Sequence, residues 1–244
     1  MCRDGVHSIQ VVSVTARARV RGAPVVVGCH QHCVSALYRG CKAGYPMSMD
    51  RRELRELHYI TPISNVPSIL ALGILSHNRA AGVFHRTVAM SEIQGRRARK
   101  AVPGGRRLHD YVNLYVTSRN PMMFKRHLEH EKLCVLRVDT EVLDLPNVVV
   151  TDRNAASDYA LFKPAPGGLD IIDAALTFAE YWTDANELVQ WQKKSAKCAE
   201  VLVPDSVGPE YVCGVYVSCP LSLRAMELSC PSVGVSIDRH LFFL

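Results

Sequence analysis

One acidic residue of this sequence occupies a position where an unpaired charge is costly. Glu200 opens the apolar run 200–203, a pattern typical of a buried strand. Burying a carboxylate without a partner costs several kcal/mol, so an acid at this position indicates a functional role. About a hundred residues earlier, Arg96, Arg97 and Arg99 form a dense basic cluster that is suited to binding phosphates. Together these residues predict an anion-binding pocket that contains one acid.

Each of these features also has a purely structural explanation. A glutamate at the start of a strand can pair with a nearby lysine, and Lys197 is three residues away. A run of arginines can be the solvated face of a helix. The sequence alone leaves both explanations open.

Composition excludes several classes of protein. The 244 residues are 48% hydrophobic and carry a formal net charge of +6, which allows one globular domain with an extension. No apolar stretch approaches the roughly 20 residues of a membrane-spanning helix, and the N-terminus lacks the order of a signal peptide, so we expect a cytoplasmic protein with no membrane partner. The motifs GxxxxGK[ST], strand-coupled GxGxxG and HExxH are absent, which disfavours phosphate-loop, dinucleotide-fold and zinc-protease readings.

The N-terminal residues 1–48 differ from the rest of the chain. They contain six basic residues against one acidic residue and no helical periodicity. We therefore predict a basic extension over 1–48, either poorly ordered or produced from an upstream start, and a domain over 49–244. Within the extension, Cys29, His30, His32 and Cys33 resemble metal ligands, but no second pair completes a zinc pattern, so we expect no metal.

Local patterns predict an α+β domain. Strands are expected at 58–61, 111–116, 133–138, 148–150, 200–203, 211–217 and 233–237. A short helix is expected from a cap at Ser64 to a terminating Gly73, and helical periodicity over 170–194 breaks near 181–184, where Thr183 or Asp184 could cap a second helix. The order of elements has no βαβ rhythm, so a doubly wound fold is disfavoured.

From about residue 57 to its end, the chain resembles the DarT-type DNA ADP-ribosyltransferases, toxins of bacterial toxin–antitoxin pairs. The matching pieces, in order, are Tyr59-Ile60-Thr61, Asn65, Ser68-Ile69-Leu70, Leu75-Ser76-His77-Asn78, Ile93-Gln94-Gly95-Arg96-Arg97, Leu108-His109-Asp110-Tyr111-Val112, Ser118-Arg119-Asn120-Pro121-Met122, Thr151-Asp152-Arg153-Asn154, Tyr181-Trp182 and Ala199-Glu200-Val201-Leu202-Val203.

This resemblance implies an ADP-ribosyltransferase fold, with two small central sheets splayed around an NAD cleft and flanking helices. It implies transfer of ADP-ribose from NAD to a base in single-stranded DNA, with release of nicotinamide, and a macrodomain ADP-ribosylglycohydrolase as the antitoxin. Glu200 matches the catalytic glutamate, and Arg97 matches an arginine that touches NAD and assists proton removal from the base.

The resemblance also assigns other residues. Tyr59, Ile60, Thr61 and Ser68 fall where the family lines the nicotinamide and ribose pocket, 79–99 would be the NAD-binding element, and 152–200 would be the substrate-recognising region. For DNA contacts we expect five polar residues of the matched pieces and their neighbours: Arg96, Arg99, Arg119, Arg153 and Asn154.

One departure from the family is clear on the first strand. The family usually reads Tyr-His-Ile-Thr, whereas this chain reads His58-Tyr59-Ile60-Thr61. Because side chains alternate across a strand, the exchange puts a tyrosine where the histidine normally faces NAD, unless a shifted register restores His58. Two other hypotheses remain: an enzyme of the same fold that modifies protein or RNA, and a non-enzymatic nucleic-acid-binding protein.

Overall fold

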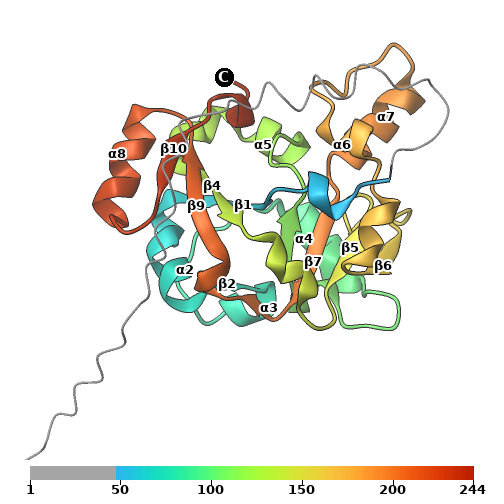
Figure 1. The fold of residues 1–244 in the computed structure, drawn as a ribbon, viewed down its shortest axis with the longest axis horizontal. Helices are drawn as coiled ribbons and strands as arrows, with labels where there is room; N and C mark the ends of the chain where they lie inside the picture. The colour runs from blue at the N-terminus through green and yellow to red at the C-terminus, as the bar shows by residue number, and fades with distance from the viewer. Residues whose placement is uncertain (1–47) are drawn as a thin grey trace, which may run out of the picture. The chain divides into compact units, whose positions relative to one another are not determined.

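The computed structural model describes residues 48–244, which contain a main sheet of eight strands and a separate two-stranded sheet (Figure 1). The main sheet has the order β10-β9-β4-β1-β3-β7-β5-β6. Its strands are β1 (Leu57–Pro62), β3 (Tyr111–Tyr115), β4 (Leu133–Val138), β5 (Val149–Thr151), β6 (Phe162–Pro164), β7 (Glu200–Pro204), β9 (Val212–Val217) and β10 (Val235–Ile237). β2 (Ile74–Leu75) and β8 (Ser206–Val207) form the small sheet. The expected α+β class is confirmed.

The main sheet consists of two four-stranded halves. β1 pairs with β4 over six residues and β3 pairs with β7 over five, but β1 and β3 meet at the single Cα pair His58 and Tyr115. The two expected sheets are therefore the two halves of one continuous sheet. Because only one residue pair connects β1 and β3, the strands of the two halves can point in different directions.

Seven α-helices surround the strands within residues 48–244. They are α2 (Val66–Leu72), α3 (His77–Ala80), α4 (Ser91–Arg99), α5 (Pro121–Lys125), α6 (Ala174–Phe178), α7 (Glu187–Ala196) and α8 (Pro220–Ser229). In Figure 1, α8 flanks the β9–β10 end of the sheet, whereas α6 and α7 lie at the opposite side of the view. None of the described helices is both long enough and apolar enough to cross a membrane.

Most local predictions match the elements, and two predicted caps are wrong. Ser64 lies in a 3-10 turn (Ile63–Asn65), and α2 starts after it at Val66. Neither Thr183 nor Asp184 caps α7, because the side chain of Asn186 accepts from Leu188 N and Val189 N. The end of α2 at Gly73 is confirmed: its φ of 83° and the 2.4 Å from a built Cβ to the Val207 carbonyl oxygen both require glycine.

Buried strands hold the two halves together. β4 and β7 are buried on both faces, and the largest apolar cluster joins β1, β3, β4, β7 and β9 to α2 and α8. This arrangement fixes the strand ends from which the polar side chains of the site project. The predicted domain boundary near residue 48 and the cysteine and histidine pattern at 29–33 lie outside the described residues.

Candidate active site

A cavity of about 320 Å³ lies between β1, β3, α4 and α5. Such a volume is typical of small-molecule sites. Its polar and aromatic lining comes from segments that are distant in sequence and includes Tyr59, Thr61, Asn65, His77, His85, Arg86, Thr87, Gln94, Arg97, His109, Tyr111, Asn113, Tyr115, Lys125, Asn154 and Lys194. The cavity therefore depends on tertiary packing of the whole domain.

Arg97 and Glu200 form a buried ion pair beside this cavity. Arg97 Nη1 lies 3.0 Å from Glu200 Oε2, and the two residues are 4% and 0% exposed. α4 supplies the arginine and lies beside β7, whose first residue is Glu200 (Figure 1). Burial raises the pKa of Glu200, while the charge and hydrogen bond of Arg97 act in the opposite direction. Arg97 thus favours the charged carboxylate at a site that otherwise disfavours it.

The structural explanations fail for Glu200 and Arg97, whereas Arg96 and Arg99 do lie on an exposed face of α4. Lys197 does not pair with Glu200, because its Nζ donates to the carbonyl oxygens of Thr177 and Ala179, at 3.1 and 2.5 Å. Arg97 is buried rather than solvated. The structure brings the acid and the arginine together: Arg97 lines the cavity, and Glu200 contacts Arg97 from outside the cavity lining.

Buried polar atoms without a hydrogen-bond partner gather at this site. Within residues 48–244 such atoms include Gln94 Oε1, Arg97 Nη2, His109 Nε2 and Glu200 Oε1, and three of the four residues line the cavity. Unpaired buried polar atoms are rare because each costs free energy, so a cluster of them indicates a polar ligand that completes their bonding. The other two, Ser118 Oγ and Arg119 Nε, belong to the loop before α5.

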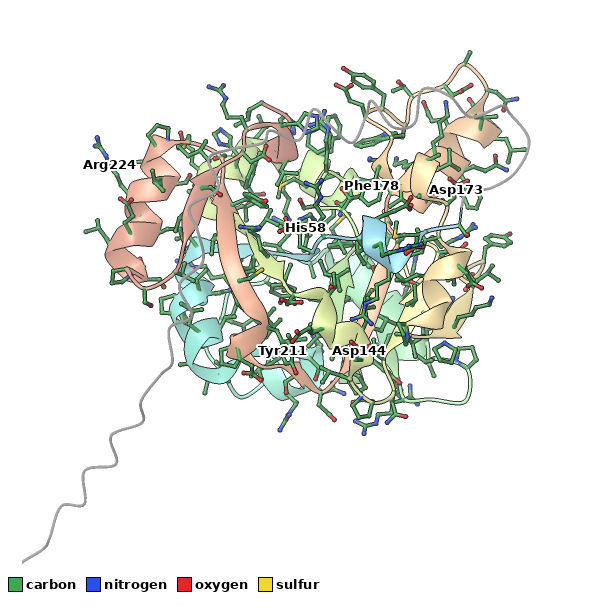
Figure 2. The ribbon with its side chains drawn as sticks, viewed as in Figure 1. His58, Asp144, Asp173, Phe178, Tyr211 and Arg224 are labelled. Atoms are coloured by element: carbon green, nitrogen blue, oxygen red, sulfur yellow. The ribbon has the colours of Figure 1, made fainter. Side chains whose placement is uncertain are left out.

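The register of β1 directs Tyr59 to the cavity and His58 away from it. Tyr59, Ile60 and Thr61 line the cavity as expected, and burial raises the pKa of Tyr59. His58, labelled in Figure 2, is held by other partners: its Nε2 lies 3.1 Å from Glu56 Oε1, and Ser118 N donates to its Nδ1 at 3.0 Å. The unshifted register is adopted, so the tyrosine occupies the cavity position.

Ser68 lies behind the main cavity. It lines a smaller hollow of about 50 Å³ with Tyr59 and Asn65, and its Oγ donates to the Asn65 carbonyl at 2.8 Å. Asn65 is the more informative neighbour, because it donates to Thr61 Oγ1 and Arg86 O and accepts from Arg86 N. This side chain joins the cavity wall at 85–90 to β1.

Of the five predicted DNA-contacting residues, Asn154 lines the cavity and Arg153 is next to it. Arg96 pairs with Glu92 one turn earlier on α4, and Arg99 is exposed. Arg119 is not free: it donates to the His240 carbonyl and lies over the Phe243 ring, 4.1 Å from its centre. The four arginines are therefore absent from the cavity lining.

Sequence reasoning assigned no site role to Gln94 or Lys194. Gln94 lies one helical turn before Arg97, so the 3.6-residue period of α4 places both on one face. The three-residue spacing from Arg97 could therefore have identified Gln94 as a site residue from sequence alone. No sequence pattern identifies Lys194 as a site residue, since its place in the cavity wall depends on how α7 packs against the rest of the domain.

Comparison with known proteins identifies the family. Residues 58–242 match the family model described as "ssDNA thymidine ADP-ribosyltransferase, DarT". A DNA ADP-ribosyl transferase–DNA ADP-ribosyl glycohydrolase fusion protein from Thermosipho africanus (strain H17ap60334) is 32% identical over 170 residues, which cover 67% of this chain and 42% of the length of that relative.

Two solved structures extend this likeness to the fold. Thermosipho africanus DarTG in complex with ADP-ribose superposes with a TM-score of 0.70 at 29% identity, covering 78% of this chain and 51% of that one. Thermus sp. 2.9 DarT in complex with ADP-ribosylated ssDNA superposes with a TM-score of 0.68 at 26% identity, covering 80% of this chain and 100% of that one. The fold is that of an ADP-ribosyltransferase, and the chain belongs to the DarT family.

Proposed function

We propose that this protein transfers ADP-ribose from NAD to a thymidine base of single-stranded DNA and releases nicotinamide. The observation that carries the proposal is the buried Arg97–Glu200 pair at a cavity whose polar atoms lack partners. The Thermus relative is bound to ADP-ribosylated ssDNA, and the family description specifies thymidine. Fold, family and site chemistry thus support one reaction.

The site suits the chemistry of glycosidic cleavage. Departure of nicotinamide builds positive charge on the ribose, and a carboxylate fixed nearby stabilises that charge as it develops. Glu200 supplies the carboxylate, and its unpartnered Oε1 remains available to a ribose hydroxyl. Arg97 favours the ionised form of Glu200, and its Nη2 has no hydrogen-bond partner in the described chain and can contact the substrate. Arg86 and Lys125, which also line the cavity, offer positive charge to the two phosphates of NAD. Tyr59 and Thr61 form the ribose-facing wall.

An exposed track of aromatic and basic side chains leads from the cavity. Trp191 and Tyr159 pack edge to face at 5.9 Å and are 43% and 71% exposed, and the Arg153 guanidinium lies 5.6 Å from the centre of the Trp191 ring. Lys194 is one turn after Trp191 on α7 and lines the cavity. Stacking surfaces combined with cations are how proteins bind single-stranded nucleic acid. We assign the flanking nucleotides to this track.

The decisive experiment measures the mass of single-stranded DNA after incubation with the protein and NAD. The protein is incubated with NAD and a pool of single-stranded oligonucleotides that covers all base contexts, followed by intact-mass analysis. We expect a gain of one ADP-ribose on thymidine-containing strands and none with Glu200→Ala. An unmodified pool would contradict the proposal, while mass on protein or RNA would indicate a different acceptor, and binding of DNA without NAD consumption would indicate a non-enzymatic protein.

The cellular role follows from this activity. We propose that the protein is the toxin of a toxin–antitoxin pair and acts in the cytoplasm by modifying DNA. The Thermosipho relative is fused to a DNA ADP-ribosyl glycohydrolase, and we propose a macrodomain glycohydrolase as the antitoxin here. Expression should arrest growth, whereas Glu200→Ala or co-expression of such a glycohydrolase should restore it; unimpaired growth at high wild-type expression would contradict the toxin role.

A further inference from the structure

One side of the proposed NAD cavity is a segment that belongs to no helix or strand. We call residues 81–90 the cavity lip, because positions 85–90 all line the cavity. None of the lip residues is buried, and Phe84 is 94% exposed. Ordering an exposed segment of this kind costs conformational entropy, so a lip that binds a ligand needs contacts that hold it in shape.

Asn65 makes the close hydrogen bonds between the lip and the rest of the domain. Its Nδ2 donates to the Arg86 carbonyl oxygen at 2.7 Å, and Arg86 N donates to its Oδ1 at 3.0 Å. Within residues 48–244, the other hydrogen bonds of the lip join residues at most four positions apart, except for a 3.9 Å contact between Lys125 Nζ and Met90 Sδ. One side-chain amide is therefore the main polar connection of the lip to the domain.

The side chain of Asn65 bonds to the cavity wall rather than to its own helix. Asn65 is the N-cap of α2, a position where asparagine is favoured because its side chain can bond the first backbone amides of the helix. Here it makes no such bond. The residue is buried, at 8% exposure, and its Nδ2 also donates to Thr61 Oγ1 at 3.1 Å. Three hydrogen bonds to two cavity-lining residues fix the amide in one orientation.

These bonds direct two polar groups toward a ligand. Because Asn65 holds both the N–H and the carbonyl oxygen of Arg86, it fixes the backbone from which the arginine side chain leaves. Within the described chain both hydrogen bonds of Arg86 use its backbone, so its guanidinium is left for a ligand, and guanidinium groups bind phosphate oxygens well. Thr61 Oγ1 accepts from Asn65, which leaves the hydroxyl proton of Thr61 for a ligand.

We propose that Asn65 is a positioning residue for NAD, an inference that rests on the proposed function. Its carboxamide holds the lip so that the guanidinium of Arg86 meets the phosphates of NAD. Without the carboxamide the lip adopts other shapes, and the affinity for NAD falls with the fraction of molecules that keep the competent shape. Asn65 thus acts on cofactor binding, through Arg86, and not on the chemical step.

The test is a double-mutant cycle on the binding of carba-NAD, an NAD analogue whose bond to nicotinamide is not cleaved. Isothermal titration calorimetry compares the wild type, Asn65→Ser, Arg86→Ala and the double variant. Asn65→Ser can still cap α2 but is too short to bond Arg86 at both atoms. Each single variant should bind about 10-fold more weakly, and the double variant should bind no more than about threefold more weakly than Arg86→Ala, because both changes remove the same contact. Asn65→Leu, of similar size but without polar atoms, should repeat the result of Asn65→Ser.

Two further measurements separate positioning from a general loss of structure. In the DNA-transfer assay, Asn65→Ser should raise KM for NAD about 10-fold and keep kcat within about threefold of the wild type, as expected when only binding is lost. Trypsin without NAD should cleave after Arg86 faster in Asn65→Ser than in the wild type. The matched control is Asn78→Ala, which removes an exposed carboxamide that donates to Asp110 outside the cavity lining and should behave as the wild type in all three assays.

The outcomes keep the role of Asn65 distinct from the function beneath it. Calorimetry needs no DNA, so a wild type that binds carba-NAD but leaves DNA unmodified refutes the DNA transfer alone, and the cycle still tests Asn65. A wild type that does not bind carba-NAD overturns both. Wild-type affinity in the two Asn65 variants overturns the positioning role, as do losses that multiply in the double variant, because Asn65 then acts independently of Arg86. A fall in kcat with unchanged KM also overturns it.

Discussion

At the scale of single residues, two opposing free-energy contributions meet in the Arg97–Glu200 pair: the cost of burying a carboxylate and the gain from its contact with a guanidinium. A buried carboxylate is costly, and the guanidinium at 3.0 Å offsets that cost. The remaining oxygen and Nη2 stay unpartnered, so the pair is not fully satisfied by the described chain. Local instability of this kind is expected where a ligand completes the bonding.

Removing the arginine alone should be strongly destabilising. Arg97→Met leaves the Glu200 carboxylate buried without a counter-charge, and we expect a loss of about 3–5 kcal/mol in the free energy of unfolding. The double variant Arg97→Met/Glu200→Gln should lose less, because no charge is then left unpaired. Urea unfolding at neutral pH measures both.

A matched surface variant controls for the loss of an arginine on α4. Arg96→Met breaks the exposed pair with Glu92 and should change stability by about 0.5 kcal/mol or less. If the Arg97 single and double variants are equally destabilised, the buried carboxylate is not the source of the cost.

Residue chemistry was partly predictable from sequence. Glu200 stood out because an acid opening an apolar strand is rare, and Arg97 was singled out by the family match rather than by composition. Arg96 and Arg119 show the limit of charge alone: the first has its own glutamate four residues earlier, and the second is bound to the His240 carbonyl. Unpartnered atoms such as His109 Nε2 could not be predicted, because they depend on the distances between elements.

At the scale of elements, Lys197 connects the strand that carries Glu200 to the end of α6. Its side chain is 1% exposed, and its Nζ donates to the carbonyls of Thr177 and Ala179. Burial and then the charge of Arg119 lower the pKa of Lys197 to about 8. The lysine therefore fixes the loop after α6 at the cost of a buried charge.

This lowered pKa predicts a defined pH dependence. Between about pH 8 and 10.5 the unfolded chain retains a proton on Lys197 that the folded chain has lost, so the stability contributed by this group rises with pH. The full rise is up to about 3 kcal/mol. In Lys197→Met this contribution should vanish, so the difference in unfolding free energy between wild type and variant should grow across that window. A constant difference would show that the amine titrates normally.

Strands were easier to predict than the joint between them. The alternating or continuous apolar runs at 133–138 and 200–203 gave β4 exactly at its bounds and β7 to within one residue, because local periodicity determines them. The single-pair contact between β1 and β3 has no local signal. Likewise the start of α7 depends on which of several capping residues packing selects, and Asn186 is the one used.

At the scale of the whole molecule, Lys194 connects the proposed NAD cavity to the proposed DNA-binding track, because it lines the cavity and lies one turn after Trp191 on α7. Arg97 and Lys194 line the cavity, Glu200 is buried behind Arg97, and Trp191 and Tyr159 are exposed outside the cavity lining. The family resemblance predicted this region only as the broad segment 152–200. The structure limits the proposed DNA-binding region to fewer residues, because Trp191 on α7 packs against Tyr159 from the segment after β5 and lies close to Arg153.

The last prediction tests this track. Trp191→Ala should weaken binding of single-stranded DNA by about 1–3 kcal/mol, the usual contribution of one stacked base, because it removes the exposed ring that Arg153 supports. The slope of affinity against salt concentration should stay unchanged, since no charge is lost. Lys194→Ala should instead reduce that slope by about one, as expected for one phosphate contact. Fluorescence anisotropy over a salt series measures the affinity and its salt dependence. The control is Leu228→Ala, because that leucine is 87% exposed on α8, which lies on the opposite side of the sheet from α7 in Figure 1. Wild-type affinity in Trp191→Ala, or an equal loss in Leu228→Ala, would place the DNA elsewhere.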